Sequence, residues 1–137
     1  MQVLEIMKTH VVKTTGDATL SEAADLIDLY QTTGLPVVDA DGGLQGMLTE
    51  SDLVRATRTV AGPLAGLQRV RDWMTTPAIS ISENAEIEEA FRILYDPGMK
   101  RLPVLSETGQ VVGVLNRIDL LQAIFEGAVG DVTTNKP

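Results

Sequence analysis

The chain has 137 residues and no cysteine, which excludes a disulfide framework and thiolate chemistry. Its hydrophobic content of 44% suffices for a core, and with only 4% aromatic residues we expect aliphatic packing. A net charge of −8 argues against a nucleic-acid partner, because phosphate backbones require a basic face, whereas a small anion needs only a few cations. No apolar run approaches the roughly 20 residues of a membrane span. No signal peptide is visible either, so we expect a soluble, cytoplasmic protein without membrane insertion.

The sequence contains one unit written twice. Residues 70–123 repeat residues 3–56 at a constant offset of 67, and the matches include the pairs Gly42/Gly109, Gly46/Gly113 and Asp52/Asp119. Each copy alone is near the size at which a core becomes marginal, so we expect the copies to fold together around a shared face. The expected organisation is a first copy at 1–60, a connector at 61–69 broken by Gly and Pro, a second copy at 70–128 and a flexible tail at 129–137.

In the first copy, hydrophobic periodicity and turn residues predict a strand, a helix, a hairpin and a second helix. The first helix has Leu20, Ala23 and Ile27 at helical spacing, and Thr19 with Glu22 forms a capping-box pattern at its start. The expected elements are an extended stretch at 11–14, a helix from residue 20, strands at 35–38 and 44–48, and a helix at about 51–60.

The second copy predicts the same order. Ile87, Ala90 and Leu94 repeat the helical spacing, with Glu86 at the cap position and Pro97-Gly98 as the stop. The expected elements are an extended stretch at 78–81, a helix from residue 87, strands at 102–105 and 111–115, and a helix at about 118–126. The predicted fold class is therefore α/β (α+β), with the order β-α-β-β-α twice.

Six short segments resemble the cystathionine-β-synthase (CBS) domain, and the two copies resemble the tandem CBS pair called a Bateman module. They are Ile6-Met7, Gly34-Leu35-Pro36-Val37-Val38-Asp39 and Gly46-Met47-Leu48-Thr49-Glu50-Ser51-Asp52-Leu53 in the first copy, and Trp73-Met74-Thr75-Thr76-Pro77, Lys100-Arg101-Leu102-Pro103-Val104-Leu105 and Gly113-Val114-Leu115-Asn116-Arg117-Ile118-Asp119-Leu120 in the second. The resemblance covers about residues 3–126. It implies two β-α-β-β-α repeats packed as a pseudo-twofold disc, with the sheets together and the helices outside.

The resemblance also implies two clefts that, in many family members, bind adenine nucleotides or S-adenosylmethionine as regulatory signals, and it implies pairing into dimers. The leading hypothesis is a homodimeric regulatory module that binds AMP, ADP or ATP, requires no cofactor, and signals occupancy to an unidentified partner protein. One alternative is a ligand-free structural or dimerisation module whose aspartates only cap helices. Another is a module that binds S-adenosylmethionine.

The candidate ligand-binding residues begin with Thr49 and Asp52, where a strand passes into a helix. Thr49 is a good N-cap and an acidic residue is favoured in the first helical turn, so capping is one interpretation. The resemblance implies another, in which Asp52 accepts the hydroxyl groups of a ribose. Asp119 recurs in the second copy with Asn116 in place of the Thr, and Asn can still cap a helix or bind a sugar.

Arg101, preceded by Lys100, stands where the family often places a phosphate-contacting cation, and a guanidinium suits phosphate oxygens. The alternative is a solvated loop. Gly34 occupies the equivalent position in the first copy and carries no charge, so we expect the two sites to differ in phosphate affinity. The remaining candidates are Val12 and Ile79, which match adenine-contacting positions but are equally compatible with core packing, and the strand prolines Pro36 and Pro103.

Catalytic motifs are missing from the sequence. It contains no Walker glycine loop and no metal-ligand cluster, and its single histidine, His10, is expected in a surface loop. We therefore expect a protein that is not an enzyme and holds no metal. Trp73 is expected to be a packing anchor between the two halves.

Overall fold

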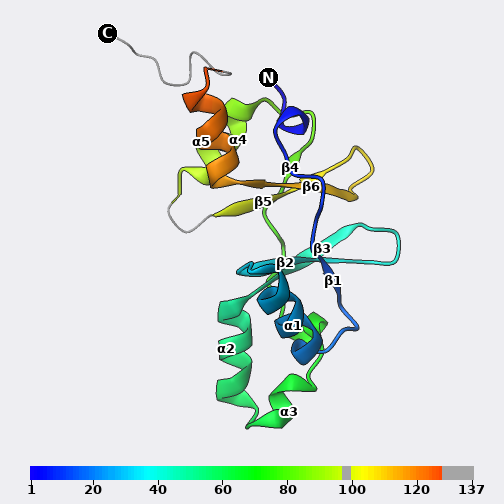
Figure 1. Cartoon of the computed structure of the whole chain (residues 1–137). Helices are drawn as coiled ribbons and strands as arrows, with labels where there is room; N and C mark the ends of the chain where they lie inside the picture. The colour runs from blue at the N-terminus through cyan, green and yellow to red at the C-terminus, as the bar shows by residue number, and fades with distance from the viewer. Residues whose placement is uncertain (97–99, 128–137) are drawn as a thin grey trace. The chain divides into compact units, whose positions relative to one another are not determined.

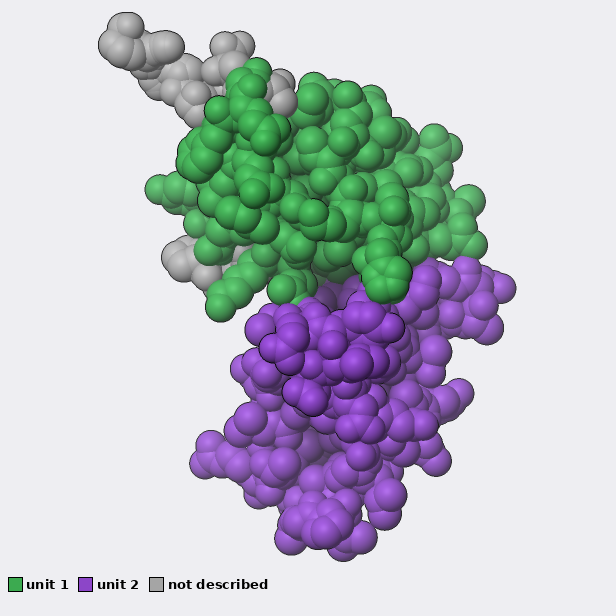
Figure 2. All heavy atoms as spheres, viewed as in Figure 1, with its two compact units in different colours: residues 1–11, 79–137 green, residues 12–78 purple. Residues whose placement is uncertain are grey.

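The computed structural model describes residues 1–96 and 100–127. It divides the chain into two compact units, which Figure 2 colours separately. Unit 1 combines Met1–Val11 with Ile79–Pro137, and unit 2 is the continuous stretch Val12–Ala78. The helix stop expected at Pro97-Gly98 and the flexible tail expected at 129–137 lie outside the described residues.

Unit 2 contains a three-stranded sheet in the order β1-β2-β3, with β1 parallel and β3 antiparallel to β2. Helices α1 and α2 pack against one another and against this sheet (Figure 1). The elements are β1 (Thr14–Thr15), α1 (Leu20–Tyr30), β2 (Gly34–Val38), β3 (Leu44–Thr49), α2 (Glu50–Thr59), α3 (Pro63–Gly66) and a 3₁₀ turn, η2 (Val70–Asp72).

Unit 1 repeats this arrangement with a sheet in the order β4-β5-β6 and the helix pair α4 and α5. Its elements are a 3₁₀ turn, η1 (Val3–Glu5), β4 (Ile81–Ser82), α4 (Ile87–Leu94), β5 (Arg101–Leu105), β6 (Val111–Asn116) and α5 (Arg117–Phe125). The predicted order β-α-β-β-α is therefore confirmed in both copies, and so is the mixed α/β class.

The capping box predicted at the start of α1 is also present. Thr19 Oγ1 accepts the Glu22 N–H at 3.1 Å, and the Thr19 N–H donates to Glu22 Oε1 at 2.9 Å. The Thr19 hydroxyl also donates to Glu22 Oε1, at 3.2 Å. The bonds that the Thr19 N–H and hydroxyl donate to this oxygen hold the pKa of Glu22 below its ordinary value, because they stabilise the ionised carboxylate. Helix α4 begins after Glu86, whose side chain makes no cap hydrogen bond.

The leading strands are shorter than the sequence predicts. Instead of 11–14 and 78–81, only Thr14–Thr15 and Ile81–Ser82 pair with the sheet, opposite Val37–Val38 and Val104–Leu105. Pro36 and Pro103 come directly before these paired residues in the central strands, and a proline has no N–H to donate to a ladder. The parallel pairing therefore begins only after each proline.

The stretch predicted as a connector, residues 61–69, contains the short helix α3. Pro63 is the first residue of this helix, where a missing N–H costs nothing and the fixed φ is already helical. The preceding Gly62 has a φ of 56°, which lets the chain enter the helix from a turn.

Each unit completes its core with a segment from the other sequence copy. Val70 belongs to the second copy, yet it is fully buried in unit 2 among Leu20, Leu35 and Leu48. Val3 belongs to the first copy and is fully buried in the core of unit 1. We call residues 1–11 and 68–78 the exchanged segments.

Trp73 is part of this exchange. It belongs to the second sequence copy and packs, partly buried beside Met74, against the core cluster of unit 2. Its equivalent in unit 1 is Ile6, which packs against the core cluster of unit 1 together with Met7.

We predict that a fragment of residues 12–78 folds, whereas a fragment of equal length, residues 1–67, does not. The second fragment lacks Val70, Trp73 and Met74, and a fully buried aliphatic side chain contributes about 1.5–3 kcal/mol. Thermal unfolding followed by circular dichroism should show a cooperative transition for 12–78 only. Cooperative unfolding of 1–67 at an equal or higher temperature would contradict the exchange.

Candidate functional site

The two predicted aspartates lie at equivalent strand-to-helix junctions, one in each unit. Thr49 ends β3 and caps α2, and Asp52 lies three residues on in the first turn of that helix. Asn116 ends β6 and precedes α5, with Asp119 in the same position. Both aspartates are buried, with only 5% of Asp52 and 8% of Asp119 exposed. Burial of a carboxylate is costly unless donors surround it, so the partners of each aspartate define its site.

The Asp52 carboxylate accepts four hydrogen bonds. Thr49 donates both its backbone N–H and its hydroxyl to Oδ2, at 2.9 and 3.1 Å. Oδ1 accepts from Arg55 Nη2 at 3.0 Å and from the Thr75 hydroxyl at 3.3 Å. The capping interpretation of Thr49 and Asp52 therefore describes real hydrogen bonds, and Asp52 additionally binds the exchanged segment through Thr75.

The Asp119 carboxylate has different partners. The Asn116 N–H donates to Oδ2 at 3.2 Å. Lys8 forms an ion pair with Oδ1 at 3.1 Å, and the Lys8 side chain is 61% exposed. Lys8 belongs to the exchanged segment of unit 1 and is the counterpart of Thr75. Each aspartate is thus contacted by the exchanged segment, through a hydroxyl in unit 2 and through an ammonium group in unit 1.

Two glycines allow the exchanged segments to come this close. The backbones of Met47 and Thr75 exchange N–H···O hydrogen bonds of 3.0 and 2.8 Å, and those of Val114 and Lys8 exchange two bonds of 2.9 Å. A Cβ on Gly46 would lie 2.9 Å from the Thr75 carbonyl oxygen. A Cβ on Gly113 would lie 2.9 Å from that of Lys8. Glycine at both positions therefore sets Thr75 and Lys8 beside the aspartates.

Arg55 is held in place by more than Asp52. Its Nη2 also donates to the Trp73 carbonyl oxygen at 3.1 Å, and its guanidinium carbon lies 5.1 Å from the centre of the Trp73 ring. A guanidinium over an aromatic face is attracted by the electrostatic field of the ring. Arg55 therefore links α2 to the exchanged segment by a hydrogen bond and a cation–π contact, while its salt bridge with Asp52 lies within α2.

Arg101 is the first residue of β5 and pairs with Asn116 across the ladder. Its side chain is half-buried, and this burial lowers the pKa of Arg101 below the ordinary value for arginine. The equivalent Gly34 pairs with Thr49. A Cβ on Gly34 would lie 3.1 Å from the Leu48 carbonyl oxygen and 3.3 Å from Thr49 Cγ2, so that junction is already crowded.

The junction of unit 1 gathers further positive charge. Lys100 is exposed next to Arg101, and its carbonyl oxygen accepts the Arg117 N–H at 3.0 Å. The structure therefore brings Arg101, Asn116 and Asp119 together at the end of the β5–β6 ladder, with Lys8 bound to Asp119. At the equivalent junction of unit 2, Thr49 donates hydrogen bonds to Asp52, and the cation paired with Asp52 is Arg55.

The other predicted residues have different surroundings. Val12 is partly buried against the core of unit 2, whereas Ile79 is 53% exposed. Pro36 and Pro103 are buried within the central strands, where they limit the parallel pairing. Their predicted role in ligand binding stays a prediction.

Sequence reasoning missed three residues at these junctions: Arg55, Thr75 and Lys8. The spacing of Asp52 and Arg55 is that of neighbours on one helix face and could have suggested their pairing. Only the offset of the repeat relates Thr75 to Lys8, and no local pattern shows that either lies near an aspartate.

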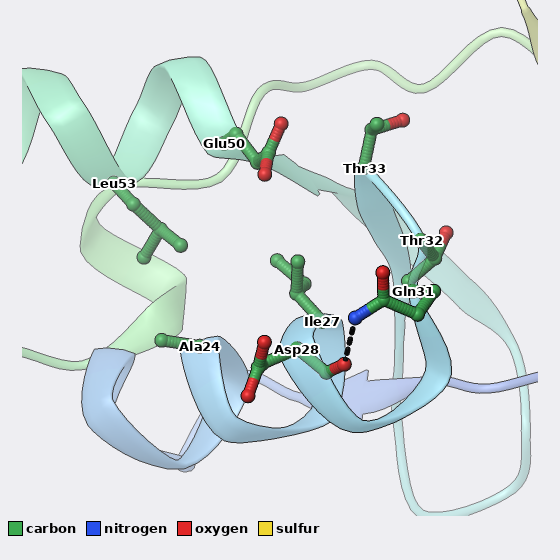
Figure 3. Close-up of a pocket in the computed structure, with 8 residues that line it drawn as sticks. All are labelled: Ala24, Ile27, Asp28, Gln31, Thr32, Thr33, Glu50 and Leu53. Carbon is green, nitrogen blue, oxygen red and sulfur yellow. Dashed lines mark hydrogen bonds between the residues drawn. The ribbon is translucent and has the colours of Figure 1, made fainter.

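Three surface grooves between helices have Leu53 or Leu120, the neighbours of the aspartates, in their walls, but they are not lined by Asp52 or Asp119. Figure 3 shows one in unit 2, of about 440 Å³, between α1 and the start of α2. Carboxylates of Asp28 and Glu50 lie on its two sides, and Gln31 Nε2 donates to the Asp28 carbonyl oxygen at 2.6 Å. No predicted site residue lines this groove, and its acidic walls oppose the binding of an anion.

Within residues 1–96 and 100–127, no three histidine or acidic side chains are grouped so that they could hold a metal ion. None of the helices in these ranges has the length and apolar character needed to cross a membrane.

Two α/β repeats, each with a buried aspartate at a strand-to-helix junction, define a tandem-repeat module. Both repeats match the family model of the CBS domain, over residues 3–58 and 70–126, so the chain belongs to the CBS-domain family. The resemblance seen in the sequence is thereby confirmed.

Individual relatives show how far the likeness extends. The CBS domain-containing protein YhcV of Bacillus subtilis is 31% identical over 134 residues, covering 97% of this chain and 93% of YhcV. Inosine-5′-monophosphate dehydrogenase of Methanocaldococcus jannaschii is 30% identical over 118 residues, covering 86% of this chain but only 22% of that enzyme. The crystal structure of CBSX2 from Arabidopsis thaliana in complex with AMP matches with a TM-score of 0.79 and 25% identity, covering 91% of this chain and 96% of CBSX2.

Proposed function

We propose that this protein is a regulatory module that binds an adenine nucleotide, AMP, ADP or ATP, and signals its occupancy to a partner protein. The observation that carries the proposal is the buried carboxylate at each strand-to-helix junction of a chain that resembles an AMP-bound CBS pair. An ionised carboxylate accepts hydrogen bonds only, which suits the adjacent hydroxyl groups of a ribose. One of the two aspartates, Asp52 or Asp119, is the proposed ribose acceptor.

The charge distribution supports a phosphorylated ligand. The chain carries a net charge of −8 and repels anions at long range. Arg101, Lys100 and Lys8 nevertheless lie at or beside the junction of Asp119. Positive groups collected around one buried carboxylate suit a molecule that presents both hydroxyl groups and phosphates.

A regulatory role is favoured over catalysis. The stretch shared with inosine-5′-monophosphate dehydrogenase is 22% of that enzyme, whereas YhcV is covered over 93% of its length. The match to the enzyme is therefore a match to a module that occurs with and without a catalytic domain. We propose that the present chain acts through ligand binding alone.

Isothermal titration with AMP, ADP, ATP and S-adenosylmethionine tests this function. We expect at least one adenine nucleotide to bind, and we expect mass spectrometry of the natively purified protein to detect the same nucleotide. Preferential binding of S-adenosylmethionine would replace the proposed ligand. Absence of binding by all four compounds at millimolar concentration would instead favour a purely structural module whose aspartates cap helices.

We predict that Arg101→Ala weakens binding of ATP or ADP more than binding of adenosine. A guanidinium contact to phosphate is charge-assisted, so its loss should cost about tenfold or more for the charged ligands. The variant should also flatten the salt dependence of binding, because salt screens a charge–charge contact at a side chain that is only half-buried.

Arg92→Ala is the matched control, because Arg92 is an exposed cation on α4 of the same unit. An equal loss of affinity for adenosine and ATP in Arg101→Ala would mean that Arg101 shapes the site without contacting phosphate.

We further propose that two chains form a homodimer. Both units leave large apolar side chains exposed on their helices, including Val54 and Leu64 in unit 2 and Ile118 and Phe125 in unit 1. Apolar surface beyond what a monomer needs is characteristic of interaction sites. Sedimentation equilibrium should give twice the chain mass of 14.7 kDa, and a monomer at tens of micromolar would contradict the proposal.

A further inference from the structure

We infer that the two junctions are unequal: Asp119 is the ribose acceptor, and Asp52 is closed to a ribose by hydrogen bonds from the chain itself. This inference rests on the proposed function, because it assigns the nucleotide of that proposal to one of two equivalent aspartates. It follows from the number of donors that each carboxylate already accepts.

The acceptor capacity of Asp52 is fully used. An ionised carboxylate offers about four lone-pair positions, two on each oxygen. Oδ2 accepts two hydrogen bonds from Thr49, and Oδ1 accepts one from Arg55 and one from Thr75. A ribose could bind here only by displacing donors that are already in place.

Asp119 retains acceptor capacity on both oxygens. Among the described residues, Oδ2 accepts the Asn116 N–H and Oδ1 contacts Lys8 Nζ. One lone-pair position therefore stays available on each oxygen. Two adjacent ribose hydroxyls can each donate to one of these oxygens, so neither Asn116 nor Lys8 has to move.

The donors at Asp52 are also difficult to displace. Arg55 would lose its charged contact with Asp52, and its position is fixed further by the Trp73 carbonyl oxygen and ring. Thr75 lies on a backbone that is hydrogen-bonded to Met47 on both sides. Each hydrogen bond to a charged group corresponds to roughly tenfold or more in affinity, so displacing two would remove most of what a ribose contact adds.

Three pairs of equivalent residues produce the difference. Where unit 2 has the donors Thr49, Arg55 and Thr75, unit 1 has Asn116, Gln122 and Lys8. Gln122 makes no hydrogen bond to Asp119 in the described part of the chain. The residues whose hydrogen bonds occupy Asp52 are therefore known, and substitutions can place the same residue types at the equivalent positions of unit 1.

The first test compares AMP with 2′-deoxyadenosine monophosphate, which lacks one of the two ribose hydroxyls, by isothermal titration. Wild-type protein should prefer AMP and bind about one molecule per chain. Asp119→Asn should lower AMP affinity by about tenfold or more and abolish the preference. Asp52→Asn should keep the preference and lower the melting temperature, because it disturbs hydrogen bonds to α2 and to the exchanged segment.

The second test leaves Asp119 and Asn116 unchanged and gives unit 1 two of the three donor residues of unit 2, those that occupy Oδ1 of Asp52. Lys8→Thr combined with Gln122→Arg should weaken AMP binding and reduce the preference over the deoxynucleotide. The reciprocal control, Thr75→Lys combined with Arg55→Gln, alters unit 2 alone and should leave the preference intact. Circular dichroism melts identify any variant that fails to fold. If Asp119→Asn is unfolded, the variant with Lys8→Thr and Gln122→Arg tests the inference in its place.

The outcomes separate this inference from the function on which it rests. A preference for AMP that is lost in Asp52→Asn and kept in Asp119→Asn would overturn the inequality and leave nucleotide binding in place. Equal losses in both variants, or two equivalent AMP molecules per chain, would also overturn it. Failure of the wild type to bind AMP, ADP or ATP would overturn the proposed function and this inference together.

Discussion

The exchanged segments are the constraint on which both units depend. Val70 fills the core formed by the first copy, and Val3 fills the core formed by the second, each without exposed surface. Because these side chains are fixed in the cores, the residues that follow them are fixed along the edges of β3 and β6. Gly46 and Gly113 then set how closely those backbones approach. The positions of Thr75 and Lys8 beside the aspartates are thus a consequence of core packing.

The same motif consequently has two different chemical environments. Asp52 and Asp119 occupy equivalent turns of equivalent helices, and both are buried. Thr49 and Asn116 differ within the motif, and the other partners, Arg55, Thr75 and Lys8, come from positions outside it, where the two copies have also diverged. In unit 2 these partners occupy the acceptor positions of the Asp52 carboxylate, and Arg55 and Thr75 connect α2 to the exchanged segment. In unit 1 they leave acceptor positions available and add positive charge.

The sequence alone predicted the order of the elements and the location of the aspartates, because both depend on local pattern. Hydrophobic spacing marks the helices, glycines mark the hairpins, and the capping box at Thr19 involves only neighbours in sequence. The exchange could not be predicted in this way. The repeat relates Val70 to Val3, but it cannot show which copy provides the core around each of them. The contacts of Lys8 and Thr75 with the aspartates were missed for the same reason.

Lys8 also suggests how a bound ligand could be detected by the rest of the chain. Unit 1 is built from residues 1–11 and residues from 79 onward, which are brought together across the whole of unit 2 in sequence. The proposed ribose acceptor belongs to the later part, and its ion-pair partner belongs to the earlier part. A ligand that binds this arrangement, and not the separated segments, stabilises it by a free energy that rises with the logarithm of the ligand concentration once that concentration exceeds the dissociation constant. Under the proposal that a nucleotide binds at Asp119, occupancy would strengthen the attachment of the N-terminal segment, and a change in nucleotide concentration would become a change in structure.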